Sequence, residues 1–238
     1  MKVAVINFSG NVGKSTLARH LLAPHMHDAQ VISVESINSD ATADVAIRGK
    51  QYGDLLQTLS LTDSAVVDIG ASNVEDLMNQ MKQYHGSHED FDYFVVPTVS
   101  KSKQQSDTIS TIDALAKMGI AANKIRLVFN MVESEETPER IFSGLFEYHA
   151  NENKFTLNPK AVVVSNDIYD RVKGTGRAIR ELSQDMTDWR AKRTEAREAG
   201  DITGMEEAVD GQMDRDLAQT AQKNLTEVWK IINGTKNE

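Results

Sequence analysis

The stretch Phe-Ser-Gly-Asn-Val-Gly-Lys-Ser-Thr at residues 8–16 constrains the fold of this chain more than any other feature. A short apolar run at residues 3–6 precedes it, and a helical pattern follows at residues 17–22. This order of strand, glycine-bearing loop, Gly-Lys-Ser-Thr and helix is typical of a phosphate-binding loop, or P-loop. In such a loop the backbone N–H groups point inward, and the helix N-terminus adds partial positive charge. The layout therefore predicts a phosphate site at the end of the first strand.

The residue types in the loop predict individual roles. Lys14 can reach the β- and γ-phosphates of a nucleotide and take part in the chemistry, and the Ser15 hydroxyl can ligate Mg²⁺. Gly10 and Gly13 allow backbone angles and a close approach that a Cβ would forbid. An ordinary glycine-rich turn between a strand and a helix is the alternative interpretation. On the first interpretation, the nucleotide is bound by Ser9, Gly10, Asn11, Val12, Gly13, Lys14, Ser15 and Thr16.

The loop departs from the strict G-x-x-x-x-G-K-[ST] pattern, because Phe8 stands where that pattern has glycine. It resembles instead the deviant loop of the ParA/MinD class of P-loop ATPases, which reads Lys-Gly-Gly-x-Gly-Lys-[Thr/Ser]. Ser9 stands at the position of the signature lysine of that class, and Asn11 replaces the second glycine.

In this class the signature lysine reaches the phosphates of the partner subunit in a nucleotide-sandwich dimer. The resemblance therefore implies a nucleotide-dependent homodimer. Because the Ser9 hydroxyl carries no charge, the contact in trans must be made by another residue. The candidates are Lys101, Lys103 and Arg177, chosen for their place in expected exposed loops.

A single aspartate, Asp68, ends an apolar run in the sequence Val-Val-Asp-Ile-Gly. P-loop ATPases place an aspartate at the end of such a strand, where it holds Mg²⁺ through water. Ser15 and Asp68 are therefore the predicted metal ligands, and Asp68 joins Lys14 among the predicted catalytic residues. The alternative is an aspartate that caps a helix or a turn. The glycine two residues later predicts a segment that senses the γ-phosphate, over residues 69–72.

Asn130 follows the apolar run at residues 125–129. An asparagine at this point contacts the adenine in the ParA/MinD class, since its amide offers both a donor and an acceptor. Guanine-specific relatives would show Asn-Lys-x-Asp or Thr-Lys-x-Asp, and the Asn-Lys-Ile-Arg at residues 123–126 lacks the aspartate. ATP is therefore favoured over GTP. An asparagine that simply begins a loop is the alternative.

The match to the class is weakest at residues 35–38, Glu-Ser-Ile-Asn. The class has Asp-x-Asp there, and the second aspartate helps to orient the attacking water. Glu35 matches the first position and is the third predicted catalytic residue, but Ile37 fills the second and cannot position water. Glu35, Asn38 or Asp40 could substitute. We expect hydrolysis that is weak, stimulated by a partner, or absent.

Short apolar runs alternate with helical patterns along most of the chain. Runs that are apolar on both faces suit the central strands of a parallel sheet. The sequence thus predicts an α/β fold of the P-loop NTPase type, with a doubly wound, mostly parallel sheet, helices on both faces and a helical C-terminal segment. We expect one domain over residues 1–238, with a core over about 1–180 and a helical part over about 181–238. The expected strands are residues 3–6, 31–34, 65–67, 94–96, 125–129 and 161–164.

The helical part begins with a pattern from about residue 177, in which Leu182, Met186 and Trp189 would share one face. If that helix continued unbroken, arginines farther along would fall on the same face. Residues 201–211 carry turn signals, and a last helix is expected over residues 213–232.

Composition excludes several classes of protein. The chain has no cysteine, which fits a cytoplasmic protein and excludes relatives that hold an iron–sulfur cluster or a zinc ion through thiolates. No transmembrane segment is expected. The net charge is −9, yet residues 171–197 hold eight basic and four acidic side chains. This segment predicts either a weak, non-specific contact with DNA or an ordinary solvated helical face.

At finer grain, residues 5–14 and 31–38 resemble the StbB plasmid stability proteins of conjugative plasmids. That resemblance implies a ParA-like switch that binds ATP and Mg²⁺, hydrolyses ATP slowly and serves plasmid stability, partition or conjugative transfer. It also implies a plasmid-encoded DNA-binding partner protein. Two other classes stay open. One is a P-loop metabolic enzyme, such as a small-molecule kinase or an ATP-dependent synthetase, and the other is a nucleotide-binding adaptor without hydrolysis.

Overall fold

A computed structural model describes residues 1–35, 45–48 and 52–234, with only the backbone described for Glu35 and residues 45–48. By the density of its contacts the chain divides into two compact units. The first unit comprises residues 1–165 together with the residues from Thr226 onward, and the second comprises residues 166–225.

The first unit contains a seven-stranded sheet in the order β3-β2-β4-β1-β5-β6-β7. Every pair of neighbouring strands is parallel, which confirms the predicted α/β fold. All six predicted strands are present, and the edge strand β3 is the one that the sequence pattern did not indicate. The strands are β1 (Lys2–Val5), β2 (Gln30–Glu35), β3 (Val45–Arg48), β4 (Ala65–Ile69), β5 (Tyr93–Thr98), β6 (Ile125–Val132) and β7 (Val162–Val164).

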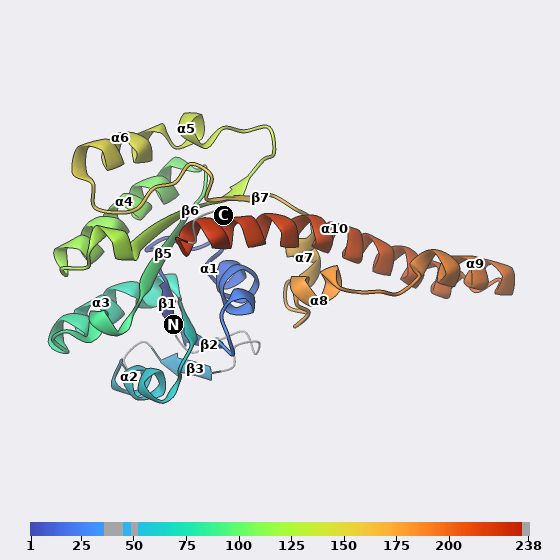
Figure 1. The fold of residues 1–238 in the computed structure, drawn as a ribbon, viewed down its shortest axis with the longest axis horizontal. Coiled ribbons are helices and arrows are strands. Elements are labelled where there is room, and N and C mark those ends of the chain that lie inside the picture. Colours follow the sequence, from blue (N-terminus) through green and yellow to red (C-terminus); the bar gives the residue numbers. More distant parts are fainter. Residues whose placement is uncertain (36–44, 49–51, 235–238) are drawn as a thin grey trace. The chain divides into compact units, whose positions relative to one another are not determined.

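Helices connect these strands, as parallel pairing requires (Figure 1). The P-loop leads into α1 (Lys14–Thr16), which continues as the π-helical η1 (Leu17–Leu22) and the 3₁₀ turn η2 (Ala23–His25). The longer helices are α2 (Tyr52–Leu61), α3 (Val74–Gln83), α4 (Ser102–Lys117) and α6 (Ser143–Glu152). The shorter ones are α5 (Pro138–Ile141), η3 (Ala71–Asn73), η4 (Ser87–Asp90) and η5 (Ala122–Lys124).

Alternate residues of each strand face opposite sides of the sheet, and both sides are covered. On one side, Ala4, Val67 and Val96 belong to a buried cluster with apolar residues of α2, α3, α4 and α6. Ile112 and Leu115 of α4 have the same core contacts and are fully buried. This buried cluster packs the helices against the sheet, and the P-loop follows directly from a central strand of that sheet.

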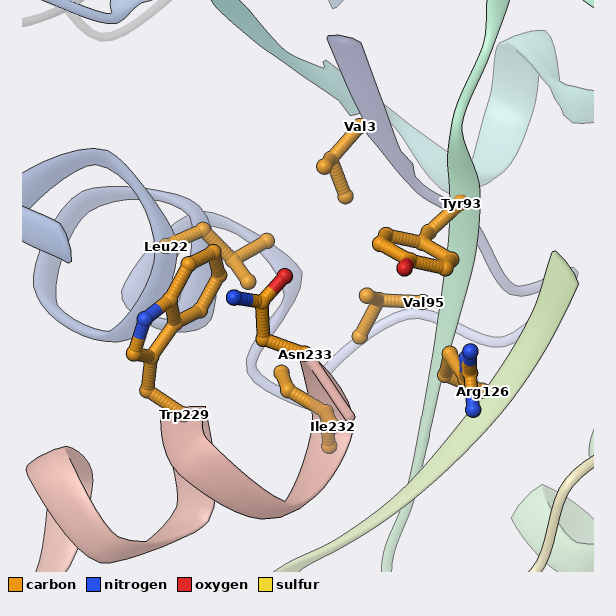
Figure 2. A pocket seen from close by; sticks show the side chains of 8 residues that line it. All are labelled: Val3, Leu22, Tyr93, Val95, Arg126, Trp229, Ile232 and Asn233. Atoms are coloured by element: carbon orange, nitrogen blue, oxygen red, sulfur yellow. The ribbon is translucent and has the colours of Figure 1, made fainter. Parts of the chain in front are cut away.

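The other side of the sheet contacts η1, and the end of a long helix, α10 (Ile202–Ile232), lines a pocket with β1 and β5 there. Figure 2 shows Trp229 and Ile232 of α10 facing Val3 of β1, Val95 of β5 and Leu22 of η1 around a small hollow. The ring of Trp229 also stacks on His25, with centroids 5.7 Å apart. The last turns of α10 therefore cover apolar surface that the central strands would otherwise expose.

The second unit is entirely helical. It contains α7 (Ile168–Val172), α8 (Ile179–Ser183), α9 (Trp189–Ala199) and the part of α10 up to Leu225. The expected helical face that joins Leu182, Met186 and Trp189 is wrong, because α8 ends at Ser183 and Met186 is 93% exposed. The break has a local cause, since Asp185 accepts hydrogen bonds from the backbone and the hydroxyl of Thr187 and from the Trp189 indole.

Helix α10 begins eleven residues earlier than the expected Met213. Gly204 and Gly211, which suggested a turn, lie inside this helix, and the neighbouring side chains explain why. A Cβ on Gly211 would lie 2.6 Å from ring atoms of Trp189, so glycine leaves room for the indole. The Asp201 carboxylate accepts a hydrogen bond from the backbone N–H of Gly204, which stabilises the first turn.

A buried aspartate in α10, Asp214, connects this helix to α7 and to the loop that follows α7. Arg171 of α7 and Arg177 each bind one of its carboxylate oxygens. Burial alone would raise the pKa of Asp214, but the hydrogen bonds from the two arginines outweigh it and lower the pKa. Two of the basic residues in the 171–197 segment are thus used inside the second unit. Among the described residues, no helix is long and apolar enough to cross a membrane.

Candidate phosphate-binding site

The P-loop, residues 8–16, leaves the carboxyl end of β1 at the centre of the sheet, between β4 and β5. The connections after β1 and after β4 run in opposite directions along the sheet. The chain passes from β1 across β4 to β2, and from β4 across β1 to β5. In open parallel sheets, ligands bind where the connections diverge in this way. The P-loop after β1 and Asp68 of β4 therefore lie at the edge of the sheet where a ligand is expected.

Lys14 lies inside the loop with only 8% of its surface exposed. Its Nζ donates to the backbone oxygen of Ser9 at 2.7 Å and to that of Asn7 at 3.2 Å. Burial lowers the pKa of Lys14 to about 8, and the charge of Asp68 opposes that shift. The ammonium is thus held by carbonyls of its own loop, which are weaker partners than a phosphate.

Asp68 lies on β4 beside Val5 of β1 and is 5% exposed. Burial raises the pKa of its carboxyl, and a hydrogen bond from Ser15 and the charges of Lys14 and Arg19 only partly offset this. Among the residues that the structure describes, Asp68 Oδ1 has no hydrogen-bond partner. A buried acceptor without a partner costs free energy, and a cation or a metal-bound water would satisfy it. The predicted metal ligands Ser15 and Asp68 are therefore in contact, and their oxygens suit Mg²⁺.

The loop backbone explains two of its residue types. Gly13 has φ +82°, and a Cβ there would lie 2.1 Å from the side-chain nitrogen of Asn130. Asn11, which replaces a glycine of the ParA/MinD pattern, has φ +55°, a left-handed conformation that asparagine tolerates. Gly10 has no positive φ, and a Cβ there would meet no protein atom within 4 Å, so its predicted close approach to a phosphate stays a prediction.

Asn130 contacts the P-loop directly. Its amide nitrogen donates to the backbone oxygen of Val12 at 2.9 Å, and both residues are buried. The residue does not follow β6, as the pattern suggested, but lies within it at an irregularity between Asn130 and Val132. The intervening Met131 has φ +56°, and such a bulge re-aims neighbouring side chains.

Asn7 and the first residues of the loop are attached to α4 by side chains that no sequence motif indicated. The Asn7 amide donates to Thr108 Oγ1 at 2.9 Å, and the Phe8 backbone N–H donates to Thr111 Oγ1 at 3.0 Å. Ser9 Oγ donates to a carboxylate oxygen of Asp107 at 2.5 Å. Buried threonines on the inner face of a helix were the available signal, because they leave polar groups to be satisfied.

The remaining candidates divide between described and undescribed parts of the chain. Glu35 ends β2, but its side chain lies outside the described residues, as do Ile37, Asn38 and Asp40 entirely. Of the candidates for a contact in trans, Arg177 donates to Asp214 at 2.5 Å. Lys101 and Lys103 are exposed at the start of α4.

No protein-family model matches the sequence, and no curated protein matches it either. Solved structures do match. A chain of the MinC:MinD cell division complex of Aquifex aeolicus aligns with 100% of this chain and 97% of its own length, with a TM-score of 0.56 and 12% identity. A variant of Cyanothece McdA in complex with ATP aligns with 100% of this chain and 97% of its own length, with a TM-score of 0.53 and 11% identity. The ParA protein of pNOB8 aligns with 98% of this chain and 99% of its own length, with a TM-score of 0.52 and 12% identity.

This chain has the ParA/MinD-like fold. The match extends over nearly the whole of both chains in each case, and includes the helical C-terminal residues. The similar structures are 10–13% identical to this chain in sequence, so the similarity shows a shared fold alone.

Proposed function

We propose that this protein is a ParA-like ATPase that works as a nucleotide-dependent switch. The observation that carries the proposal is the meeting of a buried lysine and a buried aspartate at one P-loop. In the part of the chain that the structure describes, Lys14 Nζ donates to the backbone carbonyls of Asn7 and Ser9, and Asp68 Oδ1 has no hydrogen-bond partner. Phosphate oxygens would satisfy the first, and Mg²⁺ with its water would satisfy the second.

The proposed ligand is ATP with Mg²⁺, bound by residues 9–16, with Ser15 and Asp68 as metal ligands. Asn130 is the proposed contact of the adenine. One hydrogen of its amide binds Val12, and its carbonyl oxygen and second hydrogen, which bind no other described residue, would contact the base. Because Val12 belongs to the loop, Asn130 would couple base binding to the position of the phosphates.

The proposed switch comprises the segments after β2 and β4. The backbone N–H of Gly70 and the side-chain amide of Asn73 both donate to the carbonyl of Val34, at 2.9 and 3.3 Å. Residues 69–73 are therefore tied to the end of β2, where Glu35 begins the segment that would orient the attacking water. A γ-phosphate contact in either segment would bias both.

We further propose slow hydrolysis, an ATP-dependent homodimer, and a cytoplasmic role in plasmid stability, partition or conjugative transfer. The partners would be a plasmid-encoded DNA-binding protein and DNA itself, through exposed basic residues of α9 such as Arg190 and Arg197. Lys101 and Lys103 are the proposed source of positive charge in trans. The finer likeness to StbB proteins supports the plasmid role, and the fold of pNOB8 ParA is compatible with it.

The first experiment is sedimentation velocity of the purified protein with ADP, with ATP and Mg²⁺, and with a Lys14→Ala control. We expect a dimer only with ATP and Mg²⁺, and none for the variant. A monomer under all conditions despite tight ATP binding would contradict the sandwich dimer. Measured phosphate release would then separate a slow ATPase from an adaptor that binds ATP without cleaving it.

A further inference from the structure

A chain of contacts connects helix α4 to the P-loop lysine. Ser9 is the middle of this chain, because its hydroxyl donates to Asp107 at 2.5 Å and its carbonyl accepts from Lys14 Nζ at 2.7 Å. Ser9 is 6% exposed; its bond with Lys14 is buried, and its bond with Asp107 is partly buried. The Asp107 carboxylate on α4 therefore helps to position Ser9, and the Ser9 carbonyl helps to position Lys14.

The neighbouring contacts make α4 the support of this half of the loop. Thr108 and Thr111 are fully buried and hold Asn7 and Phe8, as described above. The Asn7 carboxamide oxygen in turn accepts from the backbone N–H of Ser9 at 2.7 Å. Unlike the threonines, Asp107 is charged and only half-buried, so its bond to Ser9 is the charge-assisted member of the set.

We propose that Asp107 is a positioning residue for the phosphate-binding loop, acting through Ser9 and Lys14. Fixing the loop before a ligand arrives reduces the ordering that binding requires, and this strengthens binding. The inference rests on the proposed function, since it concerns binding of the same nucleotide. It also explains why a small hydroxyl residue suits position 9, where it can reach a carboxylate of its own chain.

The test is a double-mutant cycle on nucleotide affinity, measured by titration with ATP and Mg²⁺ and with ADP. We expect Ser9→Ala and Asp107→Ala each to weaken binding about tenfold, and the double variant to weaken it no further. Asp107→Asn keeps an acceptor for the hydroxyl and should stay within about threefold of the original protein. The matched control is Asp113→Ala, which removes another α4 carboxylate, one bound to Tyr148 and Lys154, and should leave affinity unchanged.

A second readout needs no nucleotide. The backbone N–H groups of Phe8 and Ser9 are held by Thr111 and Asn7, so their hydrogen exchange reports the order of the loop. We expect faster exchange at these residues in Asp107→Ala and Ser9→Ala, and no change in Asp113→Ala. Additive effects on affinity, tighter binding by Asp107→Ala, or unchanged exchange would each overturn the proposal.

The outcome also separates this inference from the proposed function. If the unaltered protein binds no nucleotide, or if Lys14→Ala binds as well as it does, the proposed function fails. If the unaltered protein binds and Lys14→Ala does not, while the cycle shows no coupling, only the role of Asp107 fails. Should Asp107→Ala fold poorly, Ser9→Ala and Asp107→Asn still decide the question.

Discussion

Two aspartates are buried to nearly the same extent, in different units, and their surroundings act on them in opposite ways. Asp68 in the sheet unit is 5% exposed, and Asp214 in the helical unit is 4% exposed. Burial raises the pKa of Asp68, whereas the arginines at Asp214 reverse that effect and lower its pKa. Both oxygens of Asp214 are bound by arginine, while Oδ1 of Asp68 has no partner among the described residues.

The difference separates a structural carboxylate from one that awaits a ligand. A buried charge is tolerated when it is paired, and an unpaired one is expected where function needs it. Sequence position alone does not distinguish the two cases, because each aspartate follows or interrupts an ordinary apolar pattern. The same substitution at both positions is therefore an informative comparison.

The largest effect is expected from Asp214→Asn. Loss of the charge leaves Arg171 and Arg177 without their shared carboxylate, and we expect the free energy of unfolding to fall by about 2 kcal/mol. The loss is smaller than for a fully buried pair, since the arginine side chains are 31% and 44% exposed. Chemical denaturation followed by circular dichroism measures it. Affinity for ATP should not change, and a large loss of affinity would contradict the separation of roles.

The second prediction concerns the pH dependence of binding. Burial lowers the pKa of Lys14 to about 8, so the free protein loses this charge above that pH. The negative charge of a bound phosphate favours the protonated form of Lys14. Above pH 8, nucleotide binding must therefore be accompanied by uptake of a proton on Lys14. We expect affinity to be level below pH 8 and to fall about tenfold, or about 1.4 kcal/mol, for each pH unit above it.

Titration of ATP binding from pH 7 to about 9.5 at constant ionic strength measures this profile. A flat profile would mean that Lys14 stays charged throughout. Stability should show the opposite trend, because between pH 8 and 10.5 the unfolded chain holds a proton that the folded chain has lost. The free energy of unfolding without nucleotide is thus expected to rise over that range.

The smallest effect on stability is expected from Asp68→Asn, and its sign is opposite to that of Asp214→Asn. Burial disfavours the Asp68 carboxylate more than Ser15, Lys14 and Arg19 favour it, so removing its charge should raise the free energy of unfolding by about 1 kcal/mol. The same variant should lose the part of ATP affinity that depends on Mg²⁺. Titration with and without the metal measures that part. If stability falls, the interactions of the carboxylate with Ser15, Lys14 and Arg19 outweigh the cost of its burial.

Much of the fold could be predicted from local pattern, because central strands that are buried on both faces need continuous apolar runs. The strand β3 escaped prediction, since Val45–Arg48 is short and ends in arginine. The start of α10 was misplaced because glycine usually argues against a helix. Only the structure shows the Trp189 ring that occupies the space beside Gly211.

The contacts at the candidate site could be predicted only in part. The P-loop motif brought Lys14 and Ser15 together, and Asp68 lies beside them as the strand pattern suggested. The attachment of the loop to α4 joins residues about 100 positions apart, such as Ser9 and Asp107. No spacing rule within one strand or helix connects such residues, since their contact depends on which strands are neighbours in the sheet.

The last turns of α10 have a consequence for synthesis of the chain. Val3, which precedes the P-loop, and Ile232, which lies far beyond it in the sequence, line the same hollow (Figure 2). Until Trp229 and Ile232 have left the exit tunnel, one face of the central strands lacks the part of its cover that α10 supplies, and the apolar side chains there stay open to other contacts. The nascent chain would thus be most exposed to aggregation while its P-loop is already complete.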